Sequence, residues 1–559
     1  MPNLEDYQRQ YREFTWQAAA GELAGLPQRR GLNMAYEAVD RHAADGNGER
    51  VALRWLSKTG QTRDYTYGQL QRLSNRFANA LRALGIGKGD RVCTLTGRIP
   101  ALYIAALGTL KTGSVYCPLF TAYGPDPIKT RLEQAKARLL VTTAAIYARK
   151  VAPLVDSLPH LRHVIVVGES TSERAPSGTH DFDELLKKAS DTSVIGSTAA
   201  SDWALVHFTS GTTGTPKGAI HGHGSVIAHH STAKFALDLR PEDVFWCTAD
   251  PGWITGTVYG IFAPLAVGAT LLADEADFDW ERWCHVLSQQ GVAVWYTTPT
   301  AARLMRRLGT ASIRRHPMPQ LRFLATVGEP LHPETVSWSQ EAFGRPFHDN
   351  WWQTETGAIM IANFASVDIK PGSMGNPIPG IDATVVRRLD ENTLETVPTV
   401  GEVGELALRI GWPSMFQGYL EDDARFQRCF AQGWYLSGDL VRRDEDGYFW
   451  FVGRADEVIK TSGHLIGPLE VETVLMAHPA VAETAVVGVP DPVALEVVKA
   501  FVVLNPGHTA DDTLRRQLLA YARAHLGPGI APRIIDFRPD LPKTNSGKIR
   551  RRQLRAERL

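Results

Sequence analysis

A run rich in glycine and hydroxyl side chains, FTSGTTGTPKG, extends from Phe208 to Gly218. Glycine lets the backbone curl so that its N–H groups face phosphate oxygens. One lysine adds positive charge and four side chains add hydroxyl groups: Lys217, Ser210, Thr212, Thr213 and Thr215. The spacing differs from the GxxxxGK[ST] loop of P-loop enzymes. The run follows the apolar segment ALVHF and precedes a stretch with helical character, and this strand–loop–helix context favours phosphate binding over a flexible loop without a ligand.

Four histidines follow this run and raise the question of a metal site: His221, His223, His229 and His230. The chain has no HExxH motif, and no cysteine lies at metal-ligand spacing. We therefore expect these histidines to belong to the helix after the loop rather than to bind a metal ion.

Short apolar runs rich in β-branched residues recur through the first two-thirds of the chain. They are nearly continuous rather than alternating, which is typical of strands buried on both faces. Segments with helical spacing lie between several of them, including Tyr67–Leu84 and Trp280–Gln290. This alternation predicts an α/β fold of parallel-type sheets covered by helices. The predicted strands are 91–96, 138–143, 163–168, 292–298 and 323–328.

The pattern changes after about Gly380, where ATVVRR, GELALRI and GYFWFVG predict shorter antiparallel strands in a small barrel or sheet. The last hundred residues predict a compact α+β unit with helices at Gly467–Ala477 and near Thr513–Leu526. We expect an N-terminal domain of residues 1–455, β-rich from about 381, and a C-terminal domain of residues 456–559.

Charge and cysteine usage exclude several classes of protein. Lys+Arg and Asp+Glu both number 60 in 559 residues, which gives no electrostatic footprint for nucleic acid or an anionic membrane. The five cysteines are scattered, as expected for reduced thiols. The N-terminal residues do not resemble a signal peptide, and Ala101–Leu110 is too short to span a bilayer. We expect a cytoplasmic protein with neither a nucleic-acid nor a membrane partner.

Five further segments follow FTSGTTGTPKG, and together the six resemble the ordered motifs of the adenylate-forming superfamily of acyl-CoA synthetases, luciferases and peptide-synthetase adenylation domains. They are VGEPL (Val327–Leu331), DNWWQTETG (Asp349–Gly357), YLSGDL (Tyr435–Leu440), GRADEVIKTSG (Gly453–Gly463) and LPKTNSGKIRRR (Leu541–Arg552). Within the superfamily, CTADPGWITGTVYGIFAPL and DIKPGSMGNPIPG are similar to the bacterial acetyl-CoA synthetase branch. The resemblance extends from about residue 50 to the end. It implies that ATP activates acetate as an acyl-adenylate and that CoA then accepts the acyl group.

The resemblance also implies a nucleotide site. Carboxylate and ATP are both anions, so their reaction depends on positioning and charge neutralisation. Glu355 is implied in binding Mg²⁺, which prefers hard oxygen ligands, and Thr354 in contacting the α-phosphate. Asp349 is expected near the adenine amino group and Asp439 at the ribose hydroxyls. Further implied nucleotide or CoA contacts are Thr209, Ser210, Gly211, Thr212, Thr213, Gly214, Lys217, Gly328, Glu329, Pro330, Asn350, Trp351, Gln353, Arg454 and Gly463.

By the same resemblance, Lys548 is the lysine that enters the site for adenylation, where a flexible ammonium suits the developing charge. Gly463 resembles a residue of the tunnel for the CoA pantetheine, on the opposite face of the C-terminal domain. Rotation about a hinge at Asp456 would exchange the two faces. Removal of the Lys548 charge by a lysine acetyltransferase, and its restoration by a deacetylase, is a hypothesis for regulation.

The acyl pocket is implied by Trp352, Ile254, Thr255 and Val327. Loss of one methylene contact discriminates by only about 10–200-fold, so exclusion of longer acids depends on the bulk of the indole. Trp352 can alternatively be a core aromatic without contact to substrate.

One position departs from the family pattern, because Leu465 in SGHLIG replaces a usual arginine. Three functions remain open on sequence alone. The first is an acetate–CoA ligase. The second is an adenylating ligase for another short acid such as propionate, or for a carrier-protein thiol. The third is a nucleotide-binding sensor or pseudoenzyme, which Leu465 favours and the intact Lys548, Glu355 and Asp439 disfavour.

Overall fold

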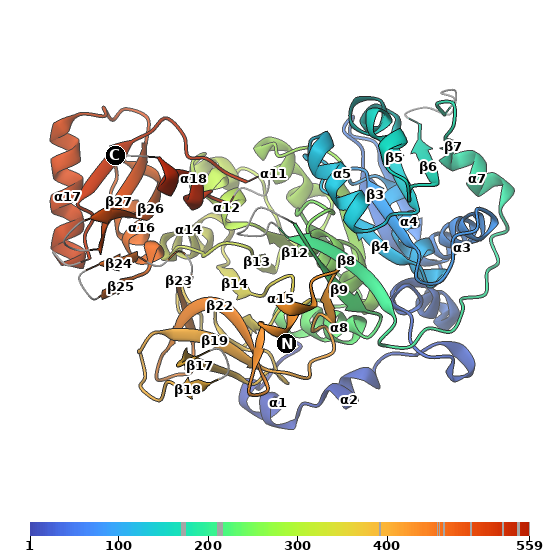
Figure 1. Ribbon diagram of the computed structural model, residues 1–559, viewed down its shortest axis with the longest axis horizontal. Coiled ribbons are helices and arrows are strands. Elements are labelled where there is room, and N and C mark those ends of the chain that lie inside the picture. The colour runs from blue at the N-terminus through green and yellow to red at the C-terminus, as the bar shows by residue number, and fades with distance from the viewer. Residues whose placement is uncertain are drawn as a thin grey trace.

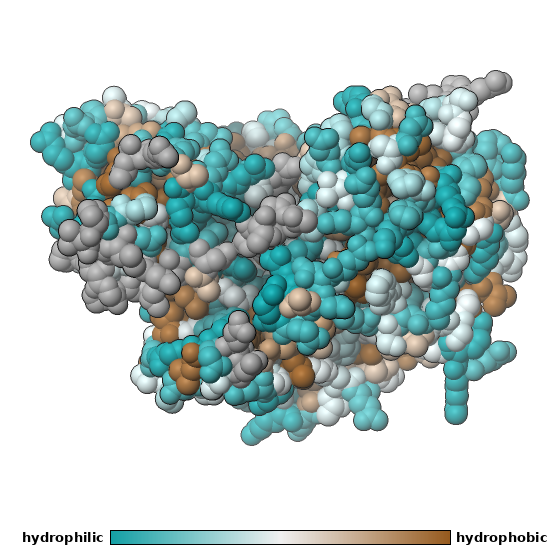
Figure 2. Space-filling model, in the orientation of Figure 1, coloured by the Kyte–Doolittle hydropathy of each residue, from teal (hydrophilic) through white to brown (hydrophobic). Residues whose placement is uncertain are grey.

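The computed structural model describes residues 1–168, 175–209, 216–390, 393–455, 457, 459–461, 464–491, 495–527, 530–544 and 548–557. The chain forms two large sheets, whose strands are interleaved in the sequence, followed by a smaller antiparallel sheet and a C-terminal sheet (Figure 1). Within the described part of the chain, no helix has both the length and the apolar character needed to cross a membrane. Hydrophilic residues cover much of the face seen in Figure 2.

The first large sheet has eight strands, and those from β4 to β7 pair in parallel. Its strands in spatial order are β20 (Gly418–Tyr419), β9 (Lys217–Gly222), β8 (Trp203–Thr209), β4 (Val115–Pro118), β3 (Arg91–Leu95), β5 (Leu139–Thr143), β6 (His163–Val167) and β7 (His180–Asp181). β9 is antiparallel to both β8 and β20.

The second large sheet has nine strands and a parallel centre from β14 to β1. In spatial order they are β16 (Asn376–Pro377), β15 (Ile361–Ala362), β14 (Phe347–Trp351), β13 (Phe323–Thr326), β12 (Val292–Thr297), β10 (Val244–Cys247), β11 (Thr270–Asp274), β1 (Val51–Leu56) and β2 (Thr62–Thr66). The five strands predicted from apolar runs are thus confirmed, as are the helices at 67–84 and 280–290.

One hydrophobic core joins both sheets through α3, α4, α8 and α10. In α4 every residue from Ala101 to Lys111 is buried, which explains why its sequence is apolar on all sides. Separate cores place α5 on the eight-stranded sheet and α11, α12 and α14 on the nine-stranded sheet. The longer helices of this part are α1 (Tyr7–Glu13), α3 (Tyr67–Ala83), α4 (Pro100–Lys111), α5 (Pro125–Gln134), α7 (Phe182–Lys188), α8 (Ser225–Ala236), α11 (Trp280–Gln289), α12 (Pro299–Arg306) and α14 (Pro333–Phe343). The short ones are α2 (Trp16–Ala20), α6 (Ala144–Ile146), α9 (Ile254–Thr257), α10 (Ala263–Val267), α13 (Thr310–Arg314) and α15 (Asp423–Gln427).

The segment after Gly380 forms the expected antiparallel sheet, and the C-terminal segment forms the expected α+β unit. The antiparallel sheet contains β17 (Ala383–Arg388), β18 (Leu394–Thr396), β19 (Gly404–Arg409), β21 (Phe430–Ala431), β22 (Trp434–Arg443) and β23 (Phe449–Arg454). The C-terminal unit contains β24 (Ile459–Thr461), β25 (His464–Ile466), β26 (Val481–Asp491), β27 (Leu495–Leu504), β28 (Ile534–Phe537), α16 (Pro468–Met476), α17 (Asp512–Leu526) and α18 (Arg551–Ala556). It has its own apolar cores, as an independent folding unit requires. In Figure 1 it lies at the left, beside α12 and α14.

Candidate active site

The glycine-rich run does not lead into a helix, so the strand–loop–helix prediction was wrong. β8 ends at Thr209, β9 begins at Lys217, and the two strands pair in antiparallel register with Thr209 opposite Lys217. Helix α8 begins only at Ser225. A helix N-terminus therefore does not follow this loop directly, and the argument from helix dipoles fails. The loop residues Ser210, Gly211, Thr212, Thr213, Gly214 and Thr215 lie outside the described residues.

Lys217 and Glu355, which the resemblance assigns to the phosphate region, are linked through Tyr419 at the start of β9. The Lys217 ammonium lies 5.4 Å from the centre of the Tyr419 ring, and the Tyr419 hydroxyl donates to Glu355 Oε1 at 2.7 Å. Partial burial and nearby Arg425 lower the pKa of Lys217, while Glu355 opposes that shift. β20, which carries Tyr419, pairs directly with β9. The eight-stranded sheet thus places the Lys217 cation near the Glu355 carboxylate of the turn after β14, with Tyr419 between them.

Asp439 on β22 is a buried carboxylate surrounded by donors. Its Oδ2 accepts from Trp351 Nε1 and Gln353 Nε2, each at 2.9 Å, and its Oδ1 accepts from Arg454 Nη1 at 3.0 Å. Burial raises the pKa of Asp439, although Arg454 and the two neutral donors oppose the shift. A carboxylate offers about four acceptor directions, so one remains for a ligand hydroxyl. The side chains of β14, β22 and β23 that were predicted to contact a nucleotide are therefore in mutual contact.

Lys548 lies beside these groups, although it belongs to the C-terminal unit. Its Nζ is 5.6 Å from the centre of the Trp253 ring. Partial desolvation of the ammonium by the neighbouring protein lowers the pKa of Lys548, although the residue as a whole is exposed, while the charges of Glu329 and Asp439 act to raise it. The backbone turn that carries the lysine is closed by Thr544 N–H donating to the Lys548 carbonyl at 2.7 Å and by Lys548 N–H donating to Thr544 Oγ1 at 3.0 Å.

Glu329 and its neighbours in VGEPL form the surface that faces Lys548, called the floor of the site below. Arg303 Nη2 donates to Glu329 Oε2 at 2.8 Å, and Thr300 donates to the other oxygen. Burial acts to raise the pKa of Glu329. The positive charges of the nearby Arg303 and Lys548 outweigh this effect, so the pKa lies below its ordinary value. Gly328 has φ +101°, and a Cβ built there would lie 2.5 Å from the Trp253 indole. Only glycine fits between these segments, and Pro330 continues the turn half-exposed.

Asp349 and Asn350 lie near the end of β14, buried next to this floor. Burial raises the pKa of Asp349 to about 8, although a bond from Thr326 Oγ1 at 3.0 Å opposes the shift. Thr354 is half-buried in the turn after β14. The carboxyl group of Asp349 is therefore protonated in much of the folded population at neutral pH.

Trp352 is buried among aromatic side chains. Its Nε1 donates to the Tyr296 hydroxyl at 3.2 Å, and its ring lies perpendicular to that of Tyr259, with centroids 5.3 Å apart. Ile254, Thr255 and Val327 are also buried, at the start of α9 and just beyond β13. All but Thr255 belong, with Trp352, to the core that joins the two sheets.

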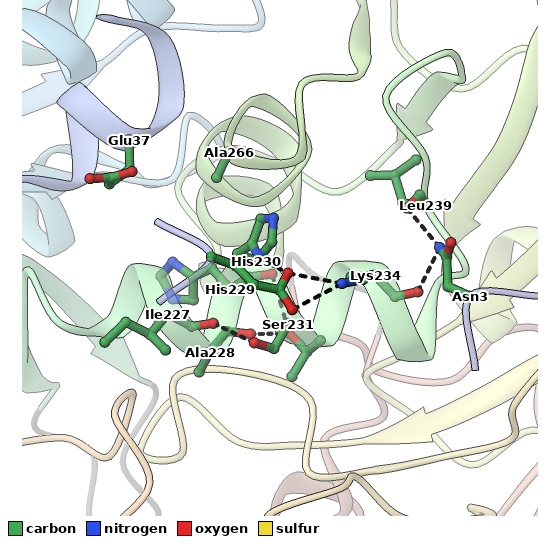
Figure 3. Close-up of polar contacts among 12 residues, drawn as sticks. Asn3, Glu37, Ile227, Ala228, His229, His230, Ser231, Lys234, Leu239 and Ala266 are labelled. Carbon is green, nitrogen blue, oxygen red and sulfur yellow. Dashed lines mark hydrogen bonds and ion pairs between the residues drawn. The ribbon is translucent and has the colours of Figure 1, made fainter. Parts of the chain in front are cut away.

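The four histidines are divided between two elements, so the prediction that all belong to the helix was only half right. His221 is on β9, and His223 lies between β9 and α8. His229 and His230 are on α8, as Figure 3 shows. The His221 ring is 3.0 Å from the Ser414 carbonyl oxygen, and His229 Nε2 is 3.0 Å from the Gly357 oxygen. Burial lowers the pKa of His221 to about 4 and of His229 to about 3, so both are neutral supports for the 354–357 turn.

The C-terminal unit also touches the rest of the chain through His332 and Thr473, whose Nδ1 and Oγ1 atoms are 3.3 Å apart. Asp456 and Gly463, the predicted hinge and tunnel residues, lie outside the described residues. Leu465 is on β25, paired with Lys460 of β24.

Several contacts were missed by sequence reasoning. Tyr419, Trp253 and Tyr296 are aromatic residues in apolar segments, and their types alone do not distinguish them from core residues. Arg303 is one of two arginines in its helix, and only its pairing with Glu329 distinguishes it. A motif-based search finds residues of the motifs, and these four lie outside the six segments.

Two unequal units, with Lys548 of the smaller one beside Glu329 and Asp439 of the larger one, form a single charged site of the kind found in two-domain nucleotide-binding enzymes. Comparisons with known proteins identify the class more closely. Residues 40–420 match the AMP-binding enzyme family, and residues 470–548 match the AMP-binding enzyme C-terminal domain. The chain belongs to the AMP-binding enzyme family, within the adenylate-forming superfamily.

Its relatives include two enzymes named acetyl-coenzyme A synthetase. That of Bacillus subtilis (strain 168) is 44% identical over 99% of this chain and 95% of its own length. That of Methanothrix thermoacetophila is 37% identical over 94% and 83%. Among solved structures, the Brucella canis acyl-CoA synthetase has a TM-score of 0.77 at 36% identity, covering 99% of this chain and 98% of its own. An anthranilate CoA ligase in complex with anthranoyl-AMP has a TM-score of 0.86 at 27% identity, covering 96% and 98%.

Proposed function

We propose that this chain is an AMP-forming acetate–CoA ligase, which converts ATP, acetate and CoA to acetyl-CoA, AMP and diphosphate through acetyl-adenylate. The observation that carries the proposal is the similarity to acetyl-coenzyme A synthetases along almost the whole chain. The position of Lys548 among Glu329, Asp439 and Arg454 supports it, because this arrangement joins the two units at one site.

In the first half-reaction, an acetate oxygen attacks the α-phosphorus of ATP and diphosphate leaves. Lys548 is proposed to stabilise the negative charge that develops on the carboxylate and α-phosphate oxygens, since a fixed cation lowers the barrier without reorganisation. Lys217 and Thr354 are proposed to position the phosphates, and Asp439 the ribose. Gly328, Glu329, Pro330 and Asp349 are proposed to hold the adenine.

Glu355 is the proposed Mg²⁺ ligand. Its Oε1 is bonded to Tyr419, and one carboxylate with substrate phosphates is a normal ligand set for Mg²⁺. The site residues therefore fit the ion, which would neutralise phosphate charge when bound with ATP.

In the second half-reaction, the thiol of CoA attacks the acetyl carbonyl and AMP leaves. Rotation of the C-terminal domain about Asp456 is proposed to withdraw Lys548 and bring Gly463 to a pantetheine tunnel. Acetylation of Lys548 would remove its charge and stop only the first half-reaction. The cytoplasmic location remains a prediction from the substrates and the free thiols.

The direct test is exchange of labelled diphosphate into ATP with acetate, propionate, butyrate or benzoate present, followed by thioester formation on addition of CoA. Exchange that is fastest with acetate and acetyl-CoA formation are expected. Exchange without thioester would contradict CoA as the acceptor, and absence of exchange with every acid would contradict adenylation.

A further inference from the structure

The Tyr296 hydroxyl links the proposed acyl pocket to the strand that precedes it. Tyr296 on β12 is completely buried, and its hydroxyl donates to Asn350 Oδ1 at 2.8 Å while accepting from Trp352 Nε1 at 3.2 Å. Two bonds with opposite directions leave the hydroxyl group little freedom to rotate. The indole is thus fixed by a chain of two hydrogen bonds and not by apolar packing alone.

The sheet explains how one tyrosine reaches both partners. Tyr296 is in register with Ala325 on β13, and Ala325 is in register with His348 on β14. Asn350 is two residues beyond His348, so it lies on the same face of the sheet as Tyr296. The small side chain of Ala325 on the intervening strand leaves space for the phenol to pass over it.

Tyr259 provides a contrasting contact with the same indole. Its ring lies 5.3 Å from that of Trp352 at 82°, but its hydroxyl is bonded elsewhere, to Thr232 Oγ1 at 2.7 Å and to the Ile359 N–H at 2.9 Å. Tyr259 therefore packs against the indole without binding its N–H. Both tyrosines are completely buried.

We propose that Tyr296 is a specificity-determining positioning residue, which holds the Trp352 indole in the orientation that limits the pocket to a two-carbon acid. The inference rests on the proposed function. Without the hydroxyl, the buried indole N–H loses its acceptor, and a buried donor without a partner is costly. The ring then gains from turning toward another acceptor, and that movement opens space for a longer acyl chain.

The test compares propionate with acetate in diphosphate exchange, as a ratio of kcat/KM values from one preparation, so that any unfolded fraction cancels. We expect Tyr296→Phe to raise the propionate-to-acetate ratio about 5-fold or more, as expected when an energy of the size of one hydrogen bond is lost. Tyr259→Phe removes a hydroxyl from the neighbouring ring and should change the ratio less than about 2-fold.

A double-variant cycle separates positioning from general loosening of the core. In a Trp352→Phe background the indole N–H is absent, so adding Tyr296→Phe should not change the ratio further. An unchanged ratio in Tyr296→Phe alone, or the same increase in both backgrounds, would overturn the inference while leaving the acetate ligase intact. Failure of the wild-type chain to use acetate would overturn both.

Discussion

Arg551 and the buried Glu472 form an ion pair, in which the Arg551 Nη2 donates to both carboxylate oxygens at 2.8 Å. Arg551 Nη1 also reaches Glu457 at 3.3 Å. Arg551 begins α18, three residues after Lys548, while Glu457 directly follows the predicted hinge residue. The pair therefore fixes the base of the segment that carries Lys548 against α16 and the start of the C-terminal unit.

Arg551→Met should destabilise the C-terminal unit, because it leaves the Glu472 carboxylate buried without its cation. Such a loss costs about 3–5 kcal/mol. We expect diphosphate exchange to fall at least about 10-fold as the lysine loses its position. Urea unfolding and exchange assays measure the two effects. Arg552→Met, at the exposed neighbouring position, is the control, and equal behaviour of both variants would contradict the assignment.

Lys548→Ala should slow acetate-dependent diphosphate exchange by about 10²–10³-fold, the usual effect of removing one group that stabilises developing charge. Formation of acetyl-CoA from added acetyl-adenylate should change little, because the second half-reaction is proposed to use the other domain orientation. Lys543→Ala removes a lysine paired with Glu483 in the same segment and serves as the control. Equal loss in both half-reactions would show that Lys548 has a general structural role.

Asp439→Asn retains the shape of the side chain but removes the charge that Arg454 and the ribose hydroxyls would share. We expect KM for ATP to rise about 10-fold or more, since hydrogen bonds to charged groups contribute about 1.5–3 kcal/mol. The wild-type preference for ATP over 2′-deoxy-ATP should shrink in the variant. Asp382→Asn, at an exposed carboxylate before β17, should leave both the KM for ATP and the preference for ATP over 2′-deoxy-ATP unchanged. A retained preference in Asp439→Asn would place the ribose elsewhere.

Trp352→Gly should extend the range of acids to propionate and butyrate while lowering acetate activity, because the cavity admits more methylene groups. Relative kcat/KM for the longer acid should rise by about 10–200-fold per methylene accommodated. Trp338→Gly is the control, because it removes an indole of similar burial from the other core: Trp338 is 8% exposed and Trp352 is 9% exposed. A chain-length profile that is the same in wild type and Trp352→Gly would show that the indole does not border the acyl group.

The lowered pKa of His229 predicts that the folded chain loses stability in mild acid. Burial lowers its pKa to about 3 in the folded chain, against 6.5 in the unfolded chain. The unfolded state therefore binds the proton first, and stability is lost as the pH falls from about 6.5 toward 3. At pH 5 one such histidine costs about 2 kcal/mol relative to pH 7. In His229→Gln the difference in unfolding free energy between pH 7 and pH 5 should shrink by about that amount. An equal difference in wild type and variant would refute the assignment.

The strands with the strongest signals were predicted from sequence because they are apolar on both faces, as in Val292–Thr297 and Phe323–Thr326. The β9 strand, KGAIHG, was mistaken for the approach to a helix. Glycine at two of six positions gives it little intrinsic strand preference, and pairing with β8 and β20 on either side stabilises it instead. Local sequence does not reveal such tertiary pairing.

The predicted nucleotide residues were located through ordered motifs, and Asp439, Trp351, Gln353 and Arg454 are indeed in contact. Their roles toward ATP remain predictions. The Arg551–Glu457 contact could not be anticipated, because 94 residues separate its partners and neither carries a distinctive local pattern. Motifs identify the residues of a site, whereas the packing around them depends on how distant segments meet.

The antiparallel pairing of β8 with β9 also sets how this region tolerates change. Thr209 and Lys217 stand opposite each other, so the two ends of the intervening loop are held about 4.8 Å apart whatever its length. A longer loop would therefore leave the paired ends of β8 and β9 in place. A slip of β9 by one residue would instead turn Lys217 and His221 to the reverse side of the sheet together. An insertion in this loop is therefore expected to disturb the sheet less than a one-residue shift in the register between β8 and β9.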